Sequence, residues 1–124
     1  MSSKILKVGI MTREEYKKRT IAIARGKYKP KRGEPKVWFE SLQSMAQVLN
    51  NENQGLLKVI IEKKPDSIKE LEALTGRKSS NLSRTLRSMA RYGIVDLKKQ
   101  NKAVKPIVKA TDFKVEFGLS SHFA

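Results

Sequence analysis

The feature that most constrains this chain is the stretch RKSSNLSRTLRSMARYG at residues 77–93. At about 3.6 residues per turn, such a stretch divides into an apolar helix face and an opposite polar, cationic face. The apolar face consists of Leu82, Leu86, Met89 and Ala90, and the cationic face of Ser80, Arg84, Arg87 and Arg91. The pattern predicts a helix over residues 77–92 that packs on one side and presents positive charge on the other.

A shorter helix is predicted just upstream, in SIKELEALTG at residues 67–76. Ser67 with Glu70 three residues later matches a capping box, and Gly76 occupies the position where a left-handed residue ends a helix. Two helices joined by a short turn match the helix-turn-helix pattern, whose second helix lies in the DNA major groove. We therefore interpret residues 77–92 as a recognition helix.

The N-terminal region is predicted to be an extension of the main domain. Residues 4–10 predict a short edge strand, and residues 12–25 predict a helix that is capped by Thr12 and Glu15. Its narrow apolar stripe contains Tyr16, Thr20, Ile23 and Ala24. Residues 26–36, rich in Lys, Arg, Pro and Gly, predict a basic connector. The domain boundaries expected from these signals are 1–36 for the basic extension, 37–117 for the DNA-binding domain and 118–124 for a tail.

Apolar spacing and turn residues predict the elements of the main domain. The first is a strand or helix entry at 37–40, with Trp38 and Phe39 as core anchors. Two helices follow, one at 41–50 with Leu42, Met45, Ala46 and Leu49 inward and one at 52–63, and the two helices described above come next. The chain then forms a hairpin with its tip at 100–102 and its return strand at 106–110, and a third strand at 113–117. Helices followed by a hairpin give the order of a winged helix. The expected fold class is α+β, a winged helix-turn-helix with a basic N-terminal helical extension and, at 39% hydrophobic residues, one core.

Charge indicates a polyanionic partner. The chain has 27 Lys and Arg against 12 Asp and Glu, a formal charge of +15, and a pI near 10.2. Residues 77–109 carry much of this excess, with Asp96 as their only acid. Candidate base-reading residues are Ser80, Asn81, Arg84 and Arg87, and candidate phosphate contacts are Arg77, Lys78, Ser79, Arg91, Lys98, Lys99, Lys102 and Lys105.

A second basic cluster lies in residues 13–36, where Lys and Arg again outnumber Glu. The candidate DNA arm within it consists of Lys27, Lys29, Lys31 and Arg32. Three interpretations stay open for this cluster: a solubilising arm, a contact to DNA phosphates or the minor groove, and a docking site for an acidic protein surface.

Composition argues against several other classes of function. The chain has no Cys and one His, His122, so neither a thiolate metal site nor a His-dependent nucleophile is expected. We expect no cofactor, no metal and no enzymatic activity. No apolar run approaches the roughly 18 residues of a spanning helix, and the charged start does not match a signal peptide, so a cytoplasmic protein is expected.

Two segments carry a resemblance to a known family: KVWFESLQSMAQVLN, and LLKVIIEKKPDSIKELEALTGRKSSNLSRTLRSMARYGIVDLKK. They resemble the winged-helix transcriptional regulators of bacteria and archaea that are antitoxin-like and often encoded beside a small toxin. The likeness covers residues 12–117 and is most specific in WFES at 38–41 and in TGRKSSNLSRTLRSMARYGIV at 75–95. The helix is also similar to MarR-like and ArsR-like regulators.

The resemblance implies sequence-specific binding of double-stranded DNA by a transcriptional regulator. We expect a repressor or autoregulator that acts as a homodimer assembled through its N-terminal region, either free-standing or as the antitoxin of a toxin–antitoxin pair. The alternative is a non-specific architectural DNA-binding or RNA-binding protein that reads only shape and charge.

Overall fold

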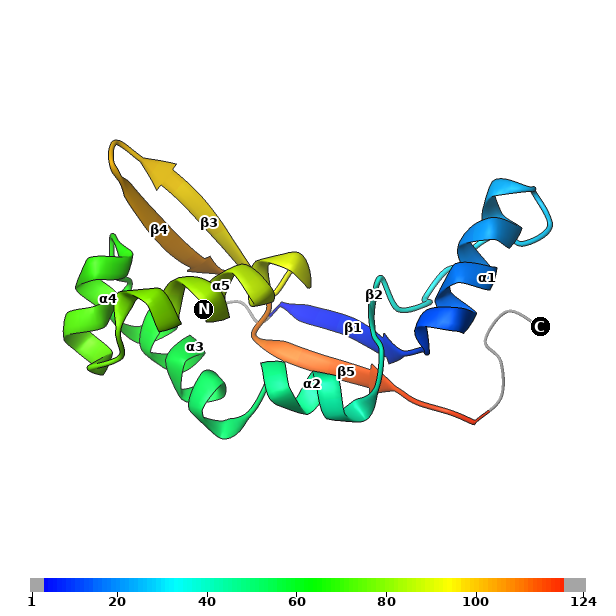
Figure 1. The fold of residues 1–124 in the computed structure, drawn as a ribbon, viewed down its shortest axis with the longest axis horizontal. Coiled ribbons are helices and arrows are strands. Elements are labelled where there is room, and N and C mark those ends of the chain that lie inside the picture. The colour runs from blue at the N-terminus through cyan, green and yellow to red at the C-terminus, as the bar shows by residue number, and fades with distance from the viewer. Residues whose placement is uncertain (1–3, 120–124) are drawn as a thin grey trace.

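The computed structural model describes residues 4–119 and has a mixed α+β fold, as the sequence predicts (Figure 1). Its elements are β1 (Ile5–Ile10), α1 (Arg13–Ala24), β2 (Val37–Phe39), α2 (Leu42–Val48), α3 (Asn51–Lys63), α4 (Ile68–Thr75), α5 (Ser79–Arg91), β3 (Val95–Gln100), β4 (Ala103–Val108) and β5 (Asp112–Glu116). Within the described part of the chain, no helix has the length and apolar character needed to cross a membrane.

A three-stranded parallel sheet in the order β2-β1-β5 joins the two ends of the chain. The prediction of an edge strand at residues 4–10 is wrong, because Val8 aligns with Val37 on one side and with Val115 on the other. The third strand predicted at 113–117 exists as β5, but it pairs with β1 and not with the hairpin. The sheet therefore ties the predicted extension to the predicted domain.

Local signals at the start and end of α4 act as predicted. The Ser67 side chain accepts a hydrogen bond from the Glu70 backbone N–H at 3.0 Å, and Gly76 ends the helix with φ of 74°. The Glu70 carboxylate accepts from the backbone N–H of Asp66 at 3.1 Å, so the second bond of the capping box goes one residue further back than expected. Helix α5 begins at Ser79, two residues later than predicted.

The apolar face of α5 forms the centre of the larger hydrophobic cluster. Leu82, Leu86 and Met89 are fully buried, and they pack with side chains of α3, α4 and β3. The members of this cluster are Leu56, Leu57, Ile60, Leu71, Leu82, Leu86, Met89, Ile94 and Val95. The sequence prediction for this face of the helix is confirmed.

A second cluster contradicts the expectation of one core. Val8, Ile10 and Phe39 form it where the parallel sheet meets α2. Tyr92, which follows α5, packs against both clusters, and its ring stacks on Phe39 with centroids 4.2 Å apart and planes at 24°. The chain thus builds two small clusters and joins them through an aromatic pair.

The inward face of α2 also differs from the prediction. Leu42 is 43% exposed and Ala46 is exposed, whereas Met45 and Val48 pack against the second cluster. The reason is that β2 precedes α2 directly, so the position of Phe39 in the sheet sets which side of this short helix meets the core.

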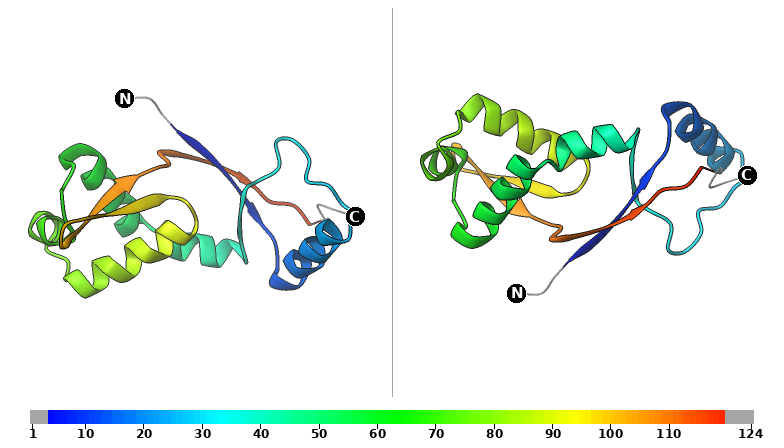
Figure 2. Two further views of the ribbon diagram at one scale, coloured as in Figure 1. Left: turned by 90° about the horizontal axis from the view of Figure 1, so that it is seen from above. Right: turned by 90° about the horizontal axis from the view of Figure 1, so that it is seen from below.

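Strands β3 and β4 form the predicted antiparallel hairpin, with Asn101 and Lys102 between them. Asn101 has φ of 54°, a left-handed conformation that Asn tolerates well in tight hairpin turns. Strand β3 lies beside α5, and β4 lies beside α3 and α4 (Figure 2).

Residues 26–36 form no helix or strand, as predicted, but they are held by a half-buried polar cluster. Glu34 accepts hydrogen bonds from the Tyr28 hydroxyl and from the Lys31 backbone N–H at 2.7 Å, and its carboxylate lies 3.5 Å from the Arg19 guanidinium. That guanidinium lies over the rings of Tyr28 and Trp38, at 5.9 and 5.4 Å from their centroids. This connector is therefore shaped by specific contacts rather than by its composition alone.

We predict that Tyr92→Ala lowers the free energy of unfolding by about 2 kcal/mol, because it removes the ring that connects the two clusters. Urea denaturation followed by circular dichroism measures this value. Tyr16→Ala is the matched control, since Tyr16 is 47% exposed, and we expect it to change stability by no more than about 0.5 kcal/mol. Equal effects of both substitutions would contradict the bridging role of Tyr92.

The Glu34 cluster predicts a pH dependence of stability. Burial raises the pKa of Glu34, but the bonds from Tyr28 and Lys31 and the charge of Arg19 outweigh it and hold the pKa below the ordinary 4.5. A lowered folded-state pKa contributes stability above the ordinary value, and this contribution is lost as the pH falls through the folded value. We expect Glu34→Gln to be less stable than the parent at pH 7 and to lose less stability between pH 5 and pH 3.

Glu62→Gln is the control for this experiment, because the Glu62 side chain is 75% exposed. Urea midpoints at several pH values should show the parent's pH dependence in Glu62→Gln and a shallower one in Glu34→Gln. Parallel pH profiles for all three proteins would show that Glu34 does not contribute.

Candidate nucleic-acid interface

The outer face of α5 is a row of exposed cationic side chains. Ser80, Arg84, Arg87 and Arg91 are all exposed, because the buried apolar face of the same helix turns them outward. Arg84, Arg87, Ala90 and Arg91 line an open hollow of about 440 Å³. The structure thus brings together three guanidinium groups on one helix face.

These guanidinium groups have no acidic partner within residues 4–119. Arg84 makes no hydrogen bond or ion pair there, Arg87 donates from Nε to the Ser83 carbonyl at 3.3 Å, and Arg91 donates to the Ser88 hydroxyl at 3.2 Å. Unneutralised, exposed cations of this kind attract anions. We call Arg84, Arg87 and Arg91 the arginine row.

Arg77, a predicted phosphate contact, is instead engaged inside the protein. Its guanidinium donates to Oδ1 of Asn81 from Nε at 2.9 Å and from Nη2 at 2.7 Å, to the Thr85 hydroxyl at 3.2 Å and to Oδ1 of Asn53 at 3.3 Å. Asn53 is nearly buried and donates in turn to the Val48 carbonyl at 3.0 Å. This network links α5 to α3 and to the end of α2.

The network changes what Asn81 can offer to a ligand. Its side chain is exposed, but its oxygen already accepts two bonds from Arg77, so its free polar group is the amide NH₂. A bidentate contact to adenine uses both the oxygen and the nitrogen of an Asn side chain. In this conformation Asn81 can only donate to a base edge and cannot accept from it.

Ser79 is occupied as well. Its backbone N–H and its hydroxyl both donate to Oε2 of Glu72, at 2.6 and 2.5 Å. The Ser79 bonds, with a smaller contribution from Lys69, hold the pKa of Glu72 below its ordinary value. Glu72 thereby caps α5, which has no cap from Lys78, and a phosphate at Ser79 would have to displace this carboxylate.

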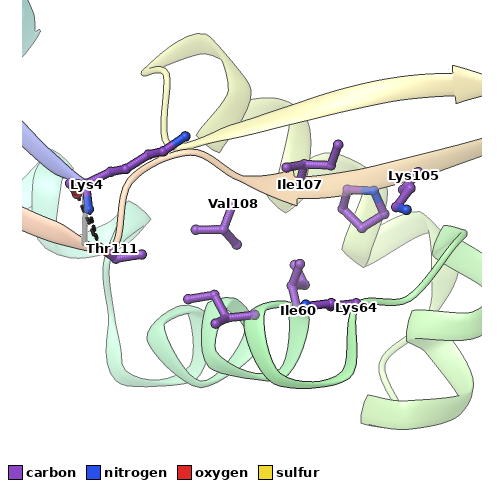
Figure 3. A pocket seen from close by; sticks show the side chains of 9 residues that line it. Lys4, Ile60, Lys64, Lys105, Ile107, Val108 and Thr111 are labelled. Atoms are coloured by element: carbon purple, nitrogen blue, oxygen red, sulfur yellow. Dashed lines mark hydrogen bonds between the residues drawn. The ribbon is translucent and has the colours of Figure 1, made fainter. Parts of the chain in front are cut away.

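The hairpin lysines differ in their surroundings. Lys98, Lys99 and Lys102 are exposed near the tip, whereas Lys105 is partly buried and lies 3.3 Å from the Asp66 carboxylate. Lys105 also lines a groove of about 380 Å³ between α3 and β4, floored by apolar side chains that include Ile60 and Val108 (Figure 3). Lys98, Lys99 and Lys102 are thus accessible to an anion, and Lys105 has a competing internal partner.

The four residues of the candidate arm, Lys27, Lys29, Lys31 and Arg32, are exposed. They lie beside α1 at the end of the molecule opposite α4 and the N-terminal end of α5 (Figure 1). The arm therefore lies away from the N-terminal end of α5. His122 lies outside the described residues.

Sequence reasoning missed Glu72, Asn53 and Thr85. Asn53 had a signal, because it precedes Leu56, Leu57 and Ile60 at helical spacing and so falls on the buried face of α3. A polar residue on such a face needs hydrogen-bond partners. Glu72 had no local signal, since its bonds to Ser79 depend on how α4 and α5 cross. Thr85 follows Arg77 and Asn81 at intervals of four residues, so helical spacing could have found its contact with Arg77.

Comparison with known proteins gives one finding. The family model HVO_A0114 matches residues 48–115, which include α3, α4, α5, the hairpin and most of β5. The WFES segment at 38–41 lies outside the matched range. No curated protein and no solved structure matches the chain. Since the match covers more than half of the sequence, the chain belongs to the HVO_A0114 family.

Proposed function

We propose that this protein is a sequence-specific double-stranded DNA-binding transcriptional regulator. In this proposal α3, α4, α5 and the β3-β4 hairpin act as a winged helix-turn-helix. Helix α5 lies in the major groove as the recognition helix, and the hairpin is the wing beside it. The protein acts as a repressor or autoregulator and binds its operator as a dimer.

The arginine row is the observation that carries the proposal. Arg84, Arg87 and Arg91 stand on one face of a helix whose opposite face is fully buried, so the helix cannot rotate to hide them. The helix is preceded by a short turn and followed by a hairpin with three exposed lysines. A guanidinium group can donate two parallel bonds to O6 and N7 of guanine, which suits a helix in the major groove.

The contacts described above refine the roles of individual residues in the proposal. Arg84 and Arg87 are the strongest candidates for contacts to base edges. The Ser80 hydroxyl and the NH₂ group of Asn81 are candidates for further hydrogen bonds to bases. Lys78, Arg91, Lys98, Lys99 and Lys102 are candidates for phosphates. Arg77, held by Asn81 and Asn53, positions α5 rather than reaching the backbone of the duplex.

One observation favours the second candidate, a non-specific architectural or RNA-binding protein. With the Asn81 oxygen occupied, the face of α5 offers mainly arginines, which also suit readout of shape and charge. Selection of binding sites from random duplexes separates the two candidates. Enrichment of one motif supports the regulator, and an unenriched pool supports the alternative.

An antitoxin role remains part of the proposal through the resemblance to antitoxin-like regulators. A neighbouring gene for a small protein toxin, and a complex between the two products, would support that role. The candidate arm is accessible in the structure for either DNA or an acidic partner.

On the selected site, we predict that Arg84→Ala weakens binding by about 1–3 kcal/mol and relaxes preference at one base pair. Lys99→Ala on the hairpin should weaken binding to all sequences alike and lower the slope of log K against log salt by about one unit. Fluorescence anisotropy on the selected duplex, its variants and random DNA measures both effects. Equal losses on specific and random DNA for both variants would refute base reading by Arg84.

The candidate arm generates a separate prediction about salt. If residues 26–36 contact flanking phosphates, replacing Lys27, Lys29, Lys31 and Arg32 by Ala should reduce the salt slope by about three to four units. The control replaces Lys58 and Lys63, two exposed lysines of α3 outside both basic clusters, and should leave the slope nearly unchanged. An unchanged slope for the arm variant would exclude the DNA contact. Docking of a protein partner on the arm would then be the interpretation to test.

A further inference from the structure

Strand β5 forms an incompletely covered edge of the parallel sheet. On the inner face of the sheet, Val8 of β1 is fully buried, whereas its neighbour in the same register row, Val115 of β5, is 44% exposed. Phe117, just after the strand, is 54% exposed. The apolar side chains on this face are therefore buried on β1 but partly exposed on β5.

Such an edge is unusual for a parallel sheet. Parallel sheets are normally covered on both faces, and an exposed apolar edge strand offers unpaired N–H and C=O groups to another strand. The opposite edge, β2, has only three residues and leads directly into α2. The β5 edge is thus the place where a further strand would complete the sheet.

The charge on this edge is compatible with a second copy of the chain. Residues 112–119 contain two acids, Asp112 and Glu116, and one base, Lys114, in a protein of formal charge +15. Repulsion between two copies is therefore weaker where these segments meet than at the arginine row, and Glu116 also lies 3.2 Å from Lys7 Nζ of its own chain. A basic partner would find little attraction on such a mixed edge.

We infer that two copies of this chain pair through β5 in antiparallel orientation about a two-fold axis at Val115. This register places Val115 opposite Val115 of the second copy, Lys114 opposite Glu116 and Phe113 opposite Phe117. The inner faces of both copies then lie on the same side, and the exposed Val115 and Phe117 are covered. The result is one continuous sheet with three strands from each copy.

The charges select this register over its neighbour. A two-fold axis at Lys114 would place Lys114 opposite Lys114 and Asp112 opposite Glu116, which are like-charge pairs that destabilise a sheet. An axis at Phe113 would leave Glu116 and Phe117 beyond the paired strand. That axis pairs Asp112 with Lys114, but it leaves Phe117 uncovered, whereas the axis at Val115 combines an opposite-charge pair with burial of both exposed apolar residues, Val115 and Phe117.

Helix α1 is the competing surface, because the sequence predicted dimerisation through its apolar stripe. Tyr16 and Ile21 are 47% and 41% exposed, but Ile23 is partly buried against the chain itself. The helix carries the bases Arg13, Lys17, Lys18 and Arg19 against the acids Glu14 and Glu15, and Arg19 is paired with Glu34, so the exposed side of α1 is still net basic. The geometry therefore favours the β5 edge, and the experiment below includes α1 as an alternative.

The chain has no cysteine, so one introduced cysteine reports on one contact. Directly opposite residues in an antiparallel pair have Cα atoms about 4.5–5.5 Å apart, within the range of a disulfide. Under mild oxidation of the full chain without DNA, in about 0.3 M salt to screen the net charge, we expect Val115→Cys to form a covalent dimer. Tyr16→Cys on α1 and Lys69→Cys on α4 should remain largely uncrosslinked.

A second measurement tests the register without a crosslink. Lys114→Glu places acids opposite Glu116 twice per dimer and should weaken dimerisation about tenfold in sedimentation equilibrium. Lys69→Glu makes the same charge change on α4, away from β5, and should not weaken it. Circular dichroism verifies that each variant is folded.

Crosslinking through Tyr16→Cys but not Val115→Cys would overturn the inference in favour of α1. A parent protein that stays monomeric at about 100 μM would also overturn it. The inference rests on the dimer of the proposed function and names its interface, and the two can be told apart. A monomer that binds its selected DNA refutes the dimer but not DNA recognition by α5, and a β5 dimer that binds no DNA refutes the regulator but not the interface.

Discussion

The burial of one face of α5 is the constraint on which the rest of the structure depends. Leu82, Leu86 and Met89 fill the larger cluster, and this packing leaves the opposite face of the helix in solvent. The same interaction therefore stabilises the domain and sets the direction of the arginine row. Any change that loosened the apolar face would also disorder the cationic one.

Polar contacts around α5 fix its position, but they occupy polar groups that could otherwise bind a ligand. Arg77 ties the helix to α3 through Asn53, and Glu72 caps its first turn at Ser79. Both contacts fix the start of the helix, where a recognition helix reads bases. They also occupy the Asn81 oxygen and the Ser79 hydroxyl. The arginine row therefore supplies most of the polar groups on α5 that remain available to a ligand.

The predictable parts of the fold and site are those coded by neighbouring residues. The Ser67 cap, Gly76, the apolar spacing of α5 and the turn at Asn101 each act within a few residues, where sterics and hydrogen bonding leave few alternatives. The exposure of Arg84 and Arg87 follows from the same helical period. Their roles toward DNA remain predictions, because no contact within one chain can test them.

The sequence by itself determined the helices, the hairpin and the cationic face of α5, because these depend on periodicity and local capping. Only the tertiary structure decided that β1 lies between β2 and β5, that Tyr92 joins two clusters, and that Arg77 and Ser79 have internal partners. The physical reason is separation along the chain. β1 and β5 are brought together by packing over the whole chain, and no local pattern at Ile5 or Asp112 identifies its partner.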